Sequence, residues 1–201
     1  RNHHIGLIRN SQQIRRIGPV AEFRPKTKKS KGNFLRIGTG SLGGKARGLA
    51  FANSYWIETN LSDKYSDITF RVPNVAVVST DEFDQFMEVN KLWETALSLD
   101  NNRDIENIFL KGRLSRKLVQ TLKEFLKGVD YPLALRSSSL LEDSQYQPLA
   151  GMYATFMLPN CHEDDKERLS QVCEAIKRIY ASIFFQDPKT LMGKISHRHE
   201  E

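Results

Sequence analysis

The stretch LALRSSSLLEDSQYQPLAGMYATF, residues 133–156, contains the strongest pattern in this chain. Its apolar start, residues 133–135, is typical of a strand and ends at Arg136, which is followed by three serines. An arginine side chain is a planar fork of donors that matches phosphate oxygens. Serines at a strand end add hydroxyl and backbone N–H groups where binding sites of α/β proteins commonly form. This end of the strand is therefore a candidate anion site.

Plainer interpretations of the same stretch stay open. Arg136 could form a structural salt bridge to Glu142 or Asp143, and the serines could be a flexible turn. We interpret these two acidic residues as capping a turn rather than binding a metal. Residues 151–155 could fold over a ligand, or they could connect a hairpin with Met152 and Tyr153 in the core.

A second candidate anion site is the segment GTGSLGGKARG, residues 38–48. Glycines let a backbone approach a ligand closely, and the N–H groups at a helix start attract anions. Lys45 would lie in the first helical turn, where a cation opposes the helix dipole, and neutralising a phosphate would explain its position. The segment is not a Walker loop, because Ala46 stands where that motif needs Ser or Thr. A plain strand-to-helix turn is the alternative.

The composition is that of a soluble globular protein of 201 residues, with 39% apolar and 27% charged residues. The net charge of +6 comes from residues 1–36, which hold ten Lys or Arg and one acid, Glu22. We interpret residues 1–33 as a basic linker or head segment, and nucleic-acid binding by it as unlikely because no recognition motif is present. No apolar run is long enough for a membrane helix. Two cysteines without a CxxC pattern favour a reduced, cytoplasmic protein, and no metal site is expected at Cys161-His162 or His197-x-His199.

Hydrophobic periodicity predicts an α+β (mixed α/β) fold, in which a small mixed sheet packs with helices. The expected strands are residues 34–37, 69–78, 131–136 and 155–158. The expected helices are 44–58, 80–90 (after a capping box at 79–82), 104–111, 115–126 and 164–185. The helix 44–58 is expected to bury Leu49, Phe51, Ala52, Tyr55 and Trp56, and Cys173 is expected on the core-facing side of the last helix.

Taken together, these segments resemble the N-terminal nucleotide-binding domain of the phosphoenolpyruvate synthase and pyruvate phosphate dikinase family. The most specific part is Arg136-Ser137-Ser138 with Glu142-Asp143, followed by Ala150-Gly151. The rest consists of Gly43-Gly44-Lys45 with Gly48-Leu49-Ala50, Val72-Pro73 with the strand 75–80, Phe83, Phe86, Thr155-Phe156 and Ile179–Phe184. The order and spacing of these segments are similar to those of the family over most of residues 37–195.

The resemblance implies that residues 34–201 form the first lobe of an ATP-grasp-like domain, truncated before the second lobe. It implies that Lys45 and Arg136 contact the nucleotide phosphates and take the catalytic roles. Ser137 would join them in binding, while Gly151 and Thr155 would belong to the loop over the phosphates. It also implies a magnesium ion whose ligands lie in the second lobe. The phosphoryl group of ATP would pass to a histidine on a swivelling domain and then to pyruvate.

Two alternatives stay open at this level. A dikinase-type phosphotransferase could use another acceptor, such as a glucan or an antibiotic, because nothing in this lobe chooses the acceptor. A non-catalytic nucleotide-sensing module is favoured slightly by Met152, Tyr153 and Ala154, where many relatives carry an acid or amides. With the second lobe outside the sequence, we expect no turnover by this chain alone and weak ATP binding at most.

Overall fold

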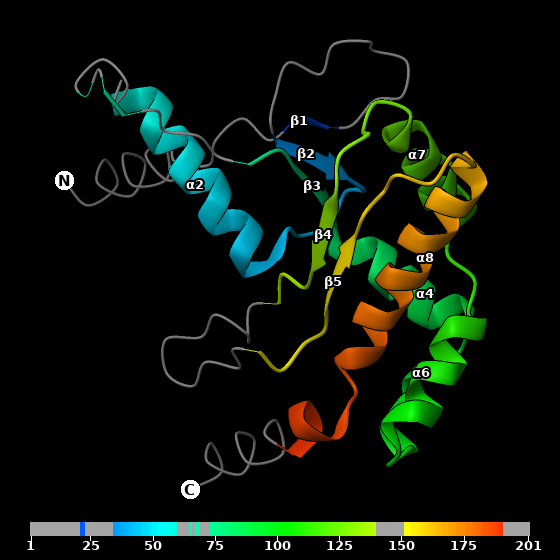
Figure 1. Ribbon diagram of the computed structural model, residues 1–201. Helices are drawn as coiled ribbons and strands as arrows, with labels where there is room; N and C mark the ends of the chain where they lie inside the picture. Colours follow the sequence, from blue (N-terminus) through cyan, green and yellow to red (C-terminus); the bar gives the residue numbers. More distant parts are fainter. Residues whose placement is uncertain are drawn as a thin grey trace, which may run out of the picture.

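The computed structural model describes residues 21–22, 34–59, 65, 67–68, 73–139 and 151–190. The described residues form helices together with short strands, which confirms the predicted α+β class (Figure 1). The strands are β1 (Ala21–Glu22), β2 (Phe34–Ile37), β3 (Val75–Val78), β4 (Leu133–Arg136) and β5 (Thr155–Leu158). The helices are α2 (Gly43–Thr59), α4 (Thr80–Val89), α5 (Trp93–Ser98), α6 (Asn102–Lys111), α7 (Arg116–Leu126) and α8 (Asp165–Ser182). No helix of these described residues is long and apolar enough to cross a membrane.

The strands form two sheets rather than one mixed sheet. β1, β2 and β3 pair in parallel in that order, so residues 21–22 of the head segment belong to the sheet. β4 and β5 form an antiparallel pair, in which Leu133 lies opposite Leu158 and Arg136 lies opposite Thr155. The carboxyl ends of parallel strands meet at one edge of a sheet, so the segments that follow β2 and β3 become neighbours.

The β2–β3 sheet is covered on both faces, because side chains alternate along each strand. Phe34 and Val77 pack against Ala46 and Ala50 of α2. The opposite face carries Ile37, which packs against α7 and α8 together with the inward side chains of β4 and β5. Figure 1 shows α2 on one side of the strands and α4, α6, α7 and α8 on the other.

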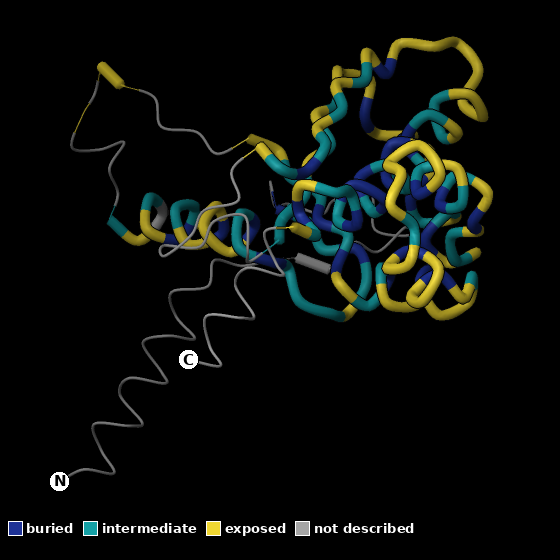
Figure 2. Tube along the Cα trace, turned by 90° about the horizontal axis from the view of Figure 1, so that it is seen from below, coloured by how far each residue is buried: buried dark blue, intermediate teal, exposed yellow. Residues whose placement is uncertain are grey.

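The predicted burial of α2 is wrong for three of its five residues. Leu49, Phe51 and Tyr55 are 37%, 47% and 52% exposed, and much of α2 is yellow or teal in Figure 2. The residues that face the sheet are instead small, since Ala46 and Ala50 are 4% and 2% exposed. Small side chains let a helix approach a sheet closely, so hydrophobicity alone pointed to the wrong side of the helix.

The helices α4, α5, α6 and α8 enclose an aromatic core. Phe86 lies 5.8 Å from Phe109 and 5.5 Å from Tyr180, measured between ring centroids. Phe184 lies 5.6 Å from Phe109 and closes the cluster. The short helix α5 was not predicted, and only Ala96 is buried on it. Cys173 packs against the neighbouring cluster, as predicted, and burial raises the pKa of its thiol.

Three cations from the C-terminal part of the chain bind the ends of other helices. Arg168, Lys177 and Lys189 donate to carbonyl groups at the carboxyl ends of α7, α6 and α5, respectively. The last carbonyls of a helix have no partner within it, and a cation there also complements the helix dipole. The sequence around α8 therefore holds the helical body together by polar as well as apolar contacts.

Candidate functional site

Two of the predicted site residues lie at the end of the β4–β5 pair where β4 ends and β5 begins. We call this the open end of the pair. Arg136 ends β4, Thr155 begins β5, and the antiparallel register places them opposite each other. Both are exposed, whereas Leu135 and Phe156 next to them lie on the more buried face of the pair. Among the described residues, the Arg136 side chain forms no hydrogen bond or ion pair, and Glu142 and Asp143 lie outside the described residues. The guanidinium is thus presented to solvent beside a hydroxyl.

Ser138 joins the two candidate anion segments. Its carbonyl accepts from Gly44 N at 2.8 Å, and its Oγ accepts from Ala46 N at 3.0 Å and donates to Leu42 O at 2.9 Å. Lys45 lies between two of these contacts, in the first turn of α2, and its ammonium nitrogen is shielded from solvent. The structure therefore brings Lys45 to the same edge as Arg136, Ser137 and Thr155.

The contact between α2 and Ser138 requires glycine at position 43. Gly43 has a φ of +77°, a conformation that L side chains rarely adopt. A Cβ on this residue would lie 1.7 Å from the carbonyl oxygen of Ser138. Gly43 therefore lets the start of α2 approach Ser138 closely. In the sequence, the glycines of this segment instead suggested the close approach of a ligand.

Asp81, in the first turn of α4, holds the start of the glycine segment. Its carboxylate accepts from Thr39 N at 2.9 Å, Thr39 Oγ1 at 2.8 Å, Gly40 N at 3.0 Å and Ser79 Oγ at 2.5 Å. Burial raises the pKa of Asp81, but these hydrogen bonds outweigh it and hold the pKa well below its usual range. The approach is close, since a Cβ on Gly40 would lie 2.6 Å from Asp81 N.

The backbone donors of the glycine segment are largely committed to protein acceptors. Thr39 and Gly40 donate to Asp81, Ser41 donates to Thr80 Oγ1 at 3.0 Å, and Gly44 and Ala46 donate to Ser138. Of the two interpretations of this segment, the geometry of these donors favours the strand-to-helix turn. The role of Lys45 in binding stays a prediction.

The predicted capping box at the start of α4 is also wrong. Ser79 Oγ makes no cap hydrogen bond to the helix and donates instead to Ile37 O at 2.9 Å and to Asp81. Glu82 is buried and accepts from Ser115 Oγ at 2.8 Å, which ties α4 to the start of α7. Tertiary partners have replaced the local ones that the pattern suggested.

The segment before β5 combines an open glycine with a fixed tyrosine. Gly151 has a φ of +78°, and a Cβ there would meet nothing within 4 Å. Tyr153 is buried, and Ala154 N donates to Ser182 Oγ at 3.1 Å at the end of α8. For Tyr153 this matches the hairpin-in-core interpretation, while the role of Gly151 in binding stays a prediction.

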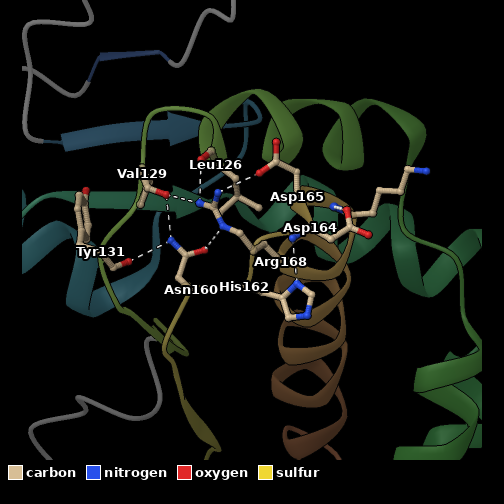
Figure 3. Close-up of polar contacts among 9 residues, drawn as sticks. Leu126, Val129, Tyr131, Asn160, His162, Asp164, Asp165 and Arg168 are labelled. Atoms are coloured by element: carbon tan, nitrogen blue, oxygen red, sulfur yellow. Dashed lines mark hydrogen bonds and ion pairs between the residues drawn. The ribbon is translucent and has the colours of Figure 1, made fainter.

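The opposite end of the β4–β5 pair is closed by a polar cluster (Figure 3). Asn160, with a φ of +54°, is buried and donates from Nδ2 to the carbonyls of Val129 and Tyr131 at 3.0 Å. Arg168 donates to Asn160 Oδ1 at 3.0 Å, to Leu126 O at 3.0 Å and to Val129 O. This cluster fixes where β4 begins and where β5 ends.

The same region shows what His162 does. His162 Nδ1 accepts from Asp164 N at 3.0 Å near the start of α8 (Figure 3). His197 and His199 lie outside the described residues. Within the ranges that the structure describes, no group of three His, Cys, Asp or Glu side chains is placed to hold a metal ion.

Sequence reasoning missed Asp81, Ser138 and Arg168 as organising residues. A signal existed for Asp81, because consecutive parallel strands place the residues after β2 next to those after β3. No comparable signal existed for Arg168, whose acceptors are carbonyls that any sequence would supply.

Comparison with known proteins identifies the family of this chain. The family model for the pyruvate phosphate dikinase AMP/ATP-binding domain matches residues 39–201, which is most of the chain. The match begins in the glycine segment and includes both ends of the β4–β5 pair. No curated protein and no solved structure matches the chain significantly.

Proposed function

Since the chain belongs to the family of pyruvate phosphate dikinase AMP/ATP-binding domains, we propose that it binds ATP at the open end of the β4–β5 pair. The observation that carries the proposal is the cross-strand pairing of Arg136 with Thr155, on an exposed face. Ser138 tethers the first turn of α2, and with it Lys45, to the same edge. The family is one of phosphotransferases, and the residues present suit its substrate.

Each residue has a distinct part in the proposed site. Arg136 offers paired donors to two phosphate oxygens, and Lys45 supplies a compact positive charge. Ser137 and Thr155 add hydroxyl groups, and Gly151 lets the backbone of the preceding loop come close to the phosphates. Phosphoryl transfer needs positioning and charge neutralisation more than covalent help from the protein. A lysine and an arginine at one edge provide that neutralisation.

The finer reaction is also part of the proposal. This chain would act as the first lobe of an ATP-grasp-like site, with the phosphoryl group passing from ATP to a histidine on another domain and then to pyruvate. A magnesium ion would reach the site with the nucleotide, and the family resemblance implies that its protein ligands lie in the second lobe. The chain supplies phosphate-binding side chains and their framework.

Titration with MgATP, followed by amide chemical shifts in NMR spectra, tests this proposal even at weak affinity. We expect shifts at residues 43–46, 136–139 and 151–155, in a saturable manner. Arg136→Met and Lys45→Met should each weaken binding about tenfold or more, because each removes a charge-assisted contact of about 1.5 kcal/mol.

Arg116→Met is the matched control, because it removes the same charge from an exposed position on α7. It should bind ATP as the unchanged chain does. Absence of shifts at millimolar ATP, or equal affinity for the unchanged chain and Arg136→Met, would contradict the proposal.

A further inference from the structure

The glycine segment after β2 already holds an anion, and that anion is part of the protein. Successive N–H groups of a turn form a concave donor set that commonly binds phosphate or carboxylate. Here, Thr39 N and Gly40 N both point at the carboxylate of Asp81, with N···O distances of 2.9 and 3.0 Å. Thr39 Oγ1 adds a third donor at 2.8 Å. The donors that would suit a bound phosphate therefore bond to the Asp81 carboxylate of α4.

We propose that Asp81 is a positioning residue that acts as an internal anion for this segment. By occupying its backbone donors, Asp81 fixes the path from Gly38 to Lys45, so that the phosphates of a nucleotide meet side chains rather than this backbone. The part concerning the nucleotide rests on the proposed function, whereas the positioning of the segment does not.

The contacts run without a break from Asp81 to Lys45. After Thr39 and Gly40, Ser41 exchanges hydrogen bonds with Thr80: Ser41 N donates to Thr80 Oγ1 at 3.0 Å, and Thr80 N donates to Ser41 O at 3.1 Å. Ser138 then holds the start of α2 on both sides of Lys45. Asp81 and Ser138 therefore hold the segment from its two ends.

An ordinary acidic residue in a first helical turn would behave differently. Such a residue stabilises its own helix through the dipole, without long-range partners. The Asp81 carboxylate instead receives three hydrogen bonds from Thr39 and Gly40, which precede it by 42 and 41 positions in the chain. The approach is close enough to need glycine at position 38, since a Cβ there would lie 2.7 Å from Asp81 Oδ1.

Amide hydrogen exchange of the whole chain tests the positioning role without any nucleotide. Asp81→Asn keeps the shape of the side chain but replaces an acceptor oxygen with a donor group. We expect exchange at residues 39–46 to become at least about tenfold faster, as expected for losing about 1.4 kcal/mol of local stability. Exchange in α6 and α7 should stay within about twofold.

Asp84→Asn is the matched control, because it removes the same charge from an exposed position on the same helix. It should leave exchange at residues 39–46 unchanged. Equal exchange in the Asp81→Asn variant and the unchanged chain, or equal acceleration in both variants, would overturn the positioning role.

ATP titration of the same variants tests the second half of the inference. Asp81→Asn should weaken ATP binding about tenfold, because Lys45 loses its fixed position, while Asp84→Asn should not. Tighter binding by Asp81→Asn would show that the freed N–H groups bind phosphate, and would overturn the inference. If the unchanged chain binds no ATP, the proposed function fails, but the exchange experiment still decides whether Asp81 positions the segment.

Discussion

The two ends of the β4–β5 pair each carry an arginine, and the two arginines are used in opposite ways. Arg168, at the closed end, donates to Leu126 O, Val129 O and Asn160 Oδ1, and its side chain is only 12% exposed (Figure 3). Arg136, at the open end, is exposed and has no side-chain partner among the described residues. An arginine whose donors are all used internally maintains a structure, whereas one held on a strand end with free donors can bind an anion.

The contrast continues in the residues around each arginine. At the closed end, the polar groups are satisfied by one another. At the open end, Ser138 holds α2 through its hydrogen bonds, while Arg136 has no side-chain partner in the ranges that the structure describes. A rigid framework next to an exposed cation suits the binding site proposed above. Four predictions follow the contrast from the most to the least damaging change.

The largest loss of stability is expected for Gly43→Ala, at the open end. The new Cβ would be forced against the Ser138 carbonyl in a left-handed conformation, so the free energy of unfolding should fall by about 4 kcal/mol. Urea denaturation followed by circular dichroism measures this. Gly48→Ala is the control within the same helix, since its Cβ meets nothing within 4 Å, and it should be neutral or stabilising by up to about 1 kcal/mol. Similar stability of both variants would contradict the tight contact.

The next largest loss is expected for Arg168→Met, at the closed end. Methionine preserves the aliphatic stem but removes the hydrogen bonds to Leu126 O, Val129 O and Asn160 Oδ1 and leaves the buried Asn160 Oδ1 without the Arg168 donor, which should cost about 3 kcal/mol. Urea denaturation again measures it, with Arg116→Met as a control that should change stability by less than about 0.5 kcal/mol. A loss no larger than the control's would show that Arg168 is not structural.

A smaller effect is expected from the acidity of Asp81. Its folded pKa lies below its unfolded pKa, so the folded state favours the charged form, and this contributes stability at neutral pH. The contribution is lost as the pH falls below about 4, the ordinary range of a carboxyl group. Asp81→Asn should therefore be less stable than the unchanged chain by about 1 kcal/mol at pH 7, given partial exposure, and the difference should shrink at pH 3. A difference that grows on acidification would contradict this sign.

The smallest effect on stability is expected for Arg136→Met, which makes the contrast with Arg168 sharpest. Because its side chain has no partner among the described residues, the free energy of unfolding should change by less than about 0.5 kcal/mol. The same variant should lose ATP affinity, as proposed above. A loss of stability near that of Arg168→Met would make Arg136 a structural residue and remove the difference between the two ends.

Much of the fold was predictable because its signals are local. Short apolar runs predicted β4 and β5, and the spacing of leucines predicted α7, whose buried residues are Leu118, Leu122 and Leu126. The grouping of the glycine segment with Arg136 at one edge was predicted from residue chemistry and family resemblance. The assignment of Lys45, Arg136, Ser137, Gly151 and Thr155 to binding stays a prediction.

The predictions were wrong where the position of a side chain depends on a tertiary contact with a distant part of the chain. The buried side of α2 was wrong because the β2–β3 sheet takes Ala46 and Ala50 rather than the larger Leu49, Phe51 and Tyr55. The capping box was wrong because Ser79 and Glu82 find distant partners, Ile37 and Ser115. A local sequence pattern shows neither which distant residues the fold brings close nor which of several partners a side chain will bond to.

The sequence by itself determined the class of fold, most of the elements, the family and the two segments that meet at the open end. It could do so because periodicity, glycine content and the chemistry of a Lys or Arg side chain are properties of short stretches. Only the tertiary structure decided that the backbone donors of the glycine segment bond to Asp81 and Ser138, and that Arg168 is fully hydrogen-bonded while Arg136 is exposed and has no side-chain partner among the described residues. A hydrogen bond forms only when the fold brings donor and acceptor within about 3 Å, and for these residues the fold bridges roughly 40 to 90 positions of sequence.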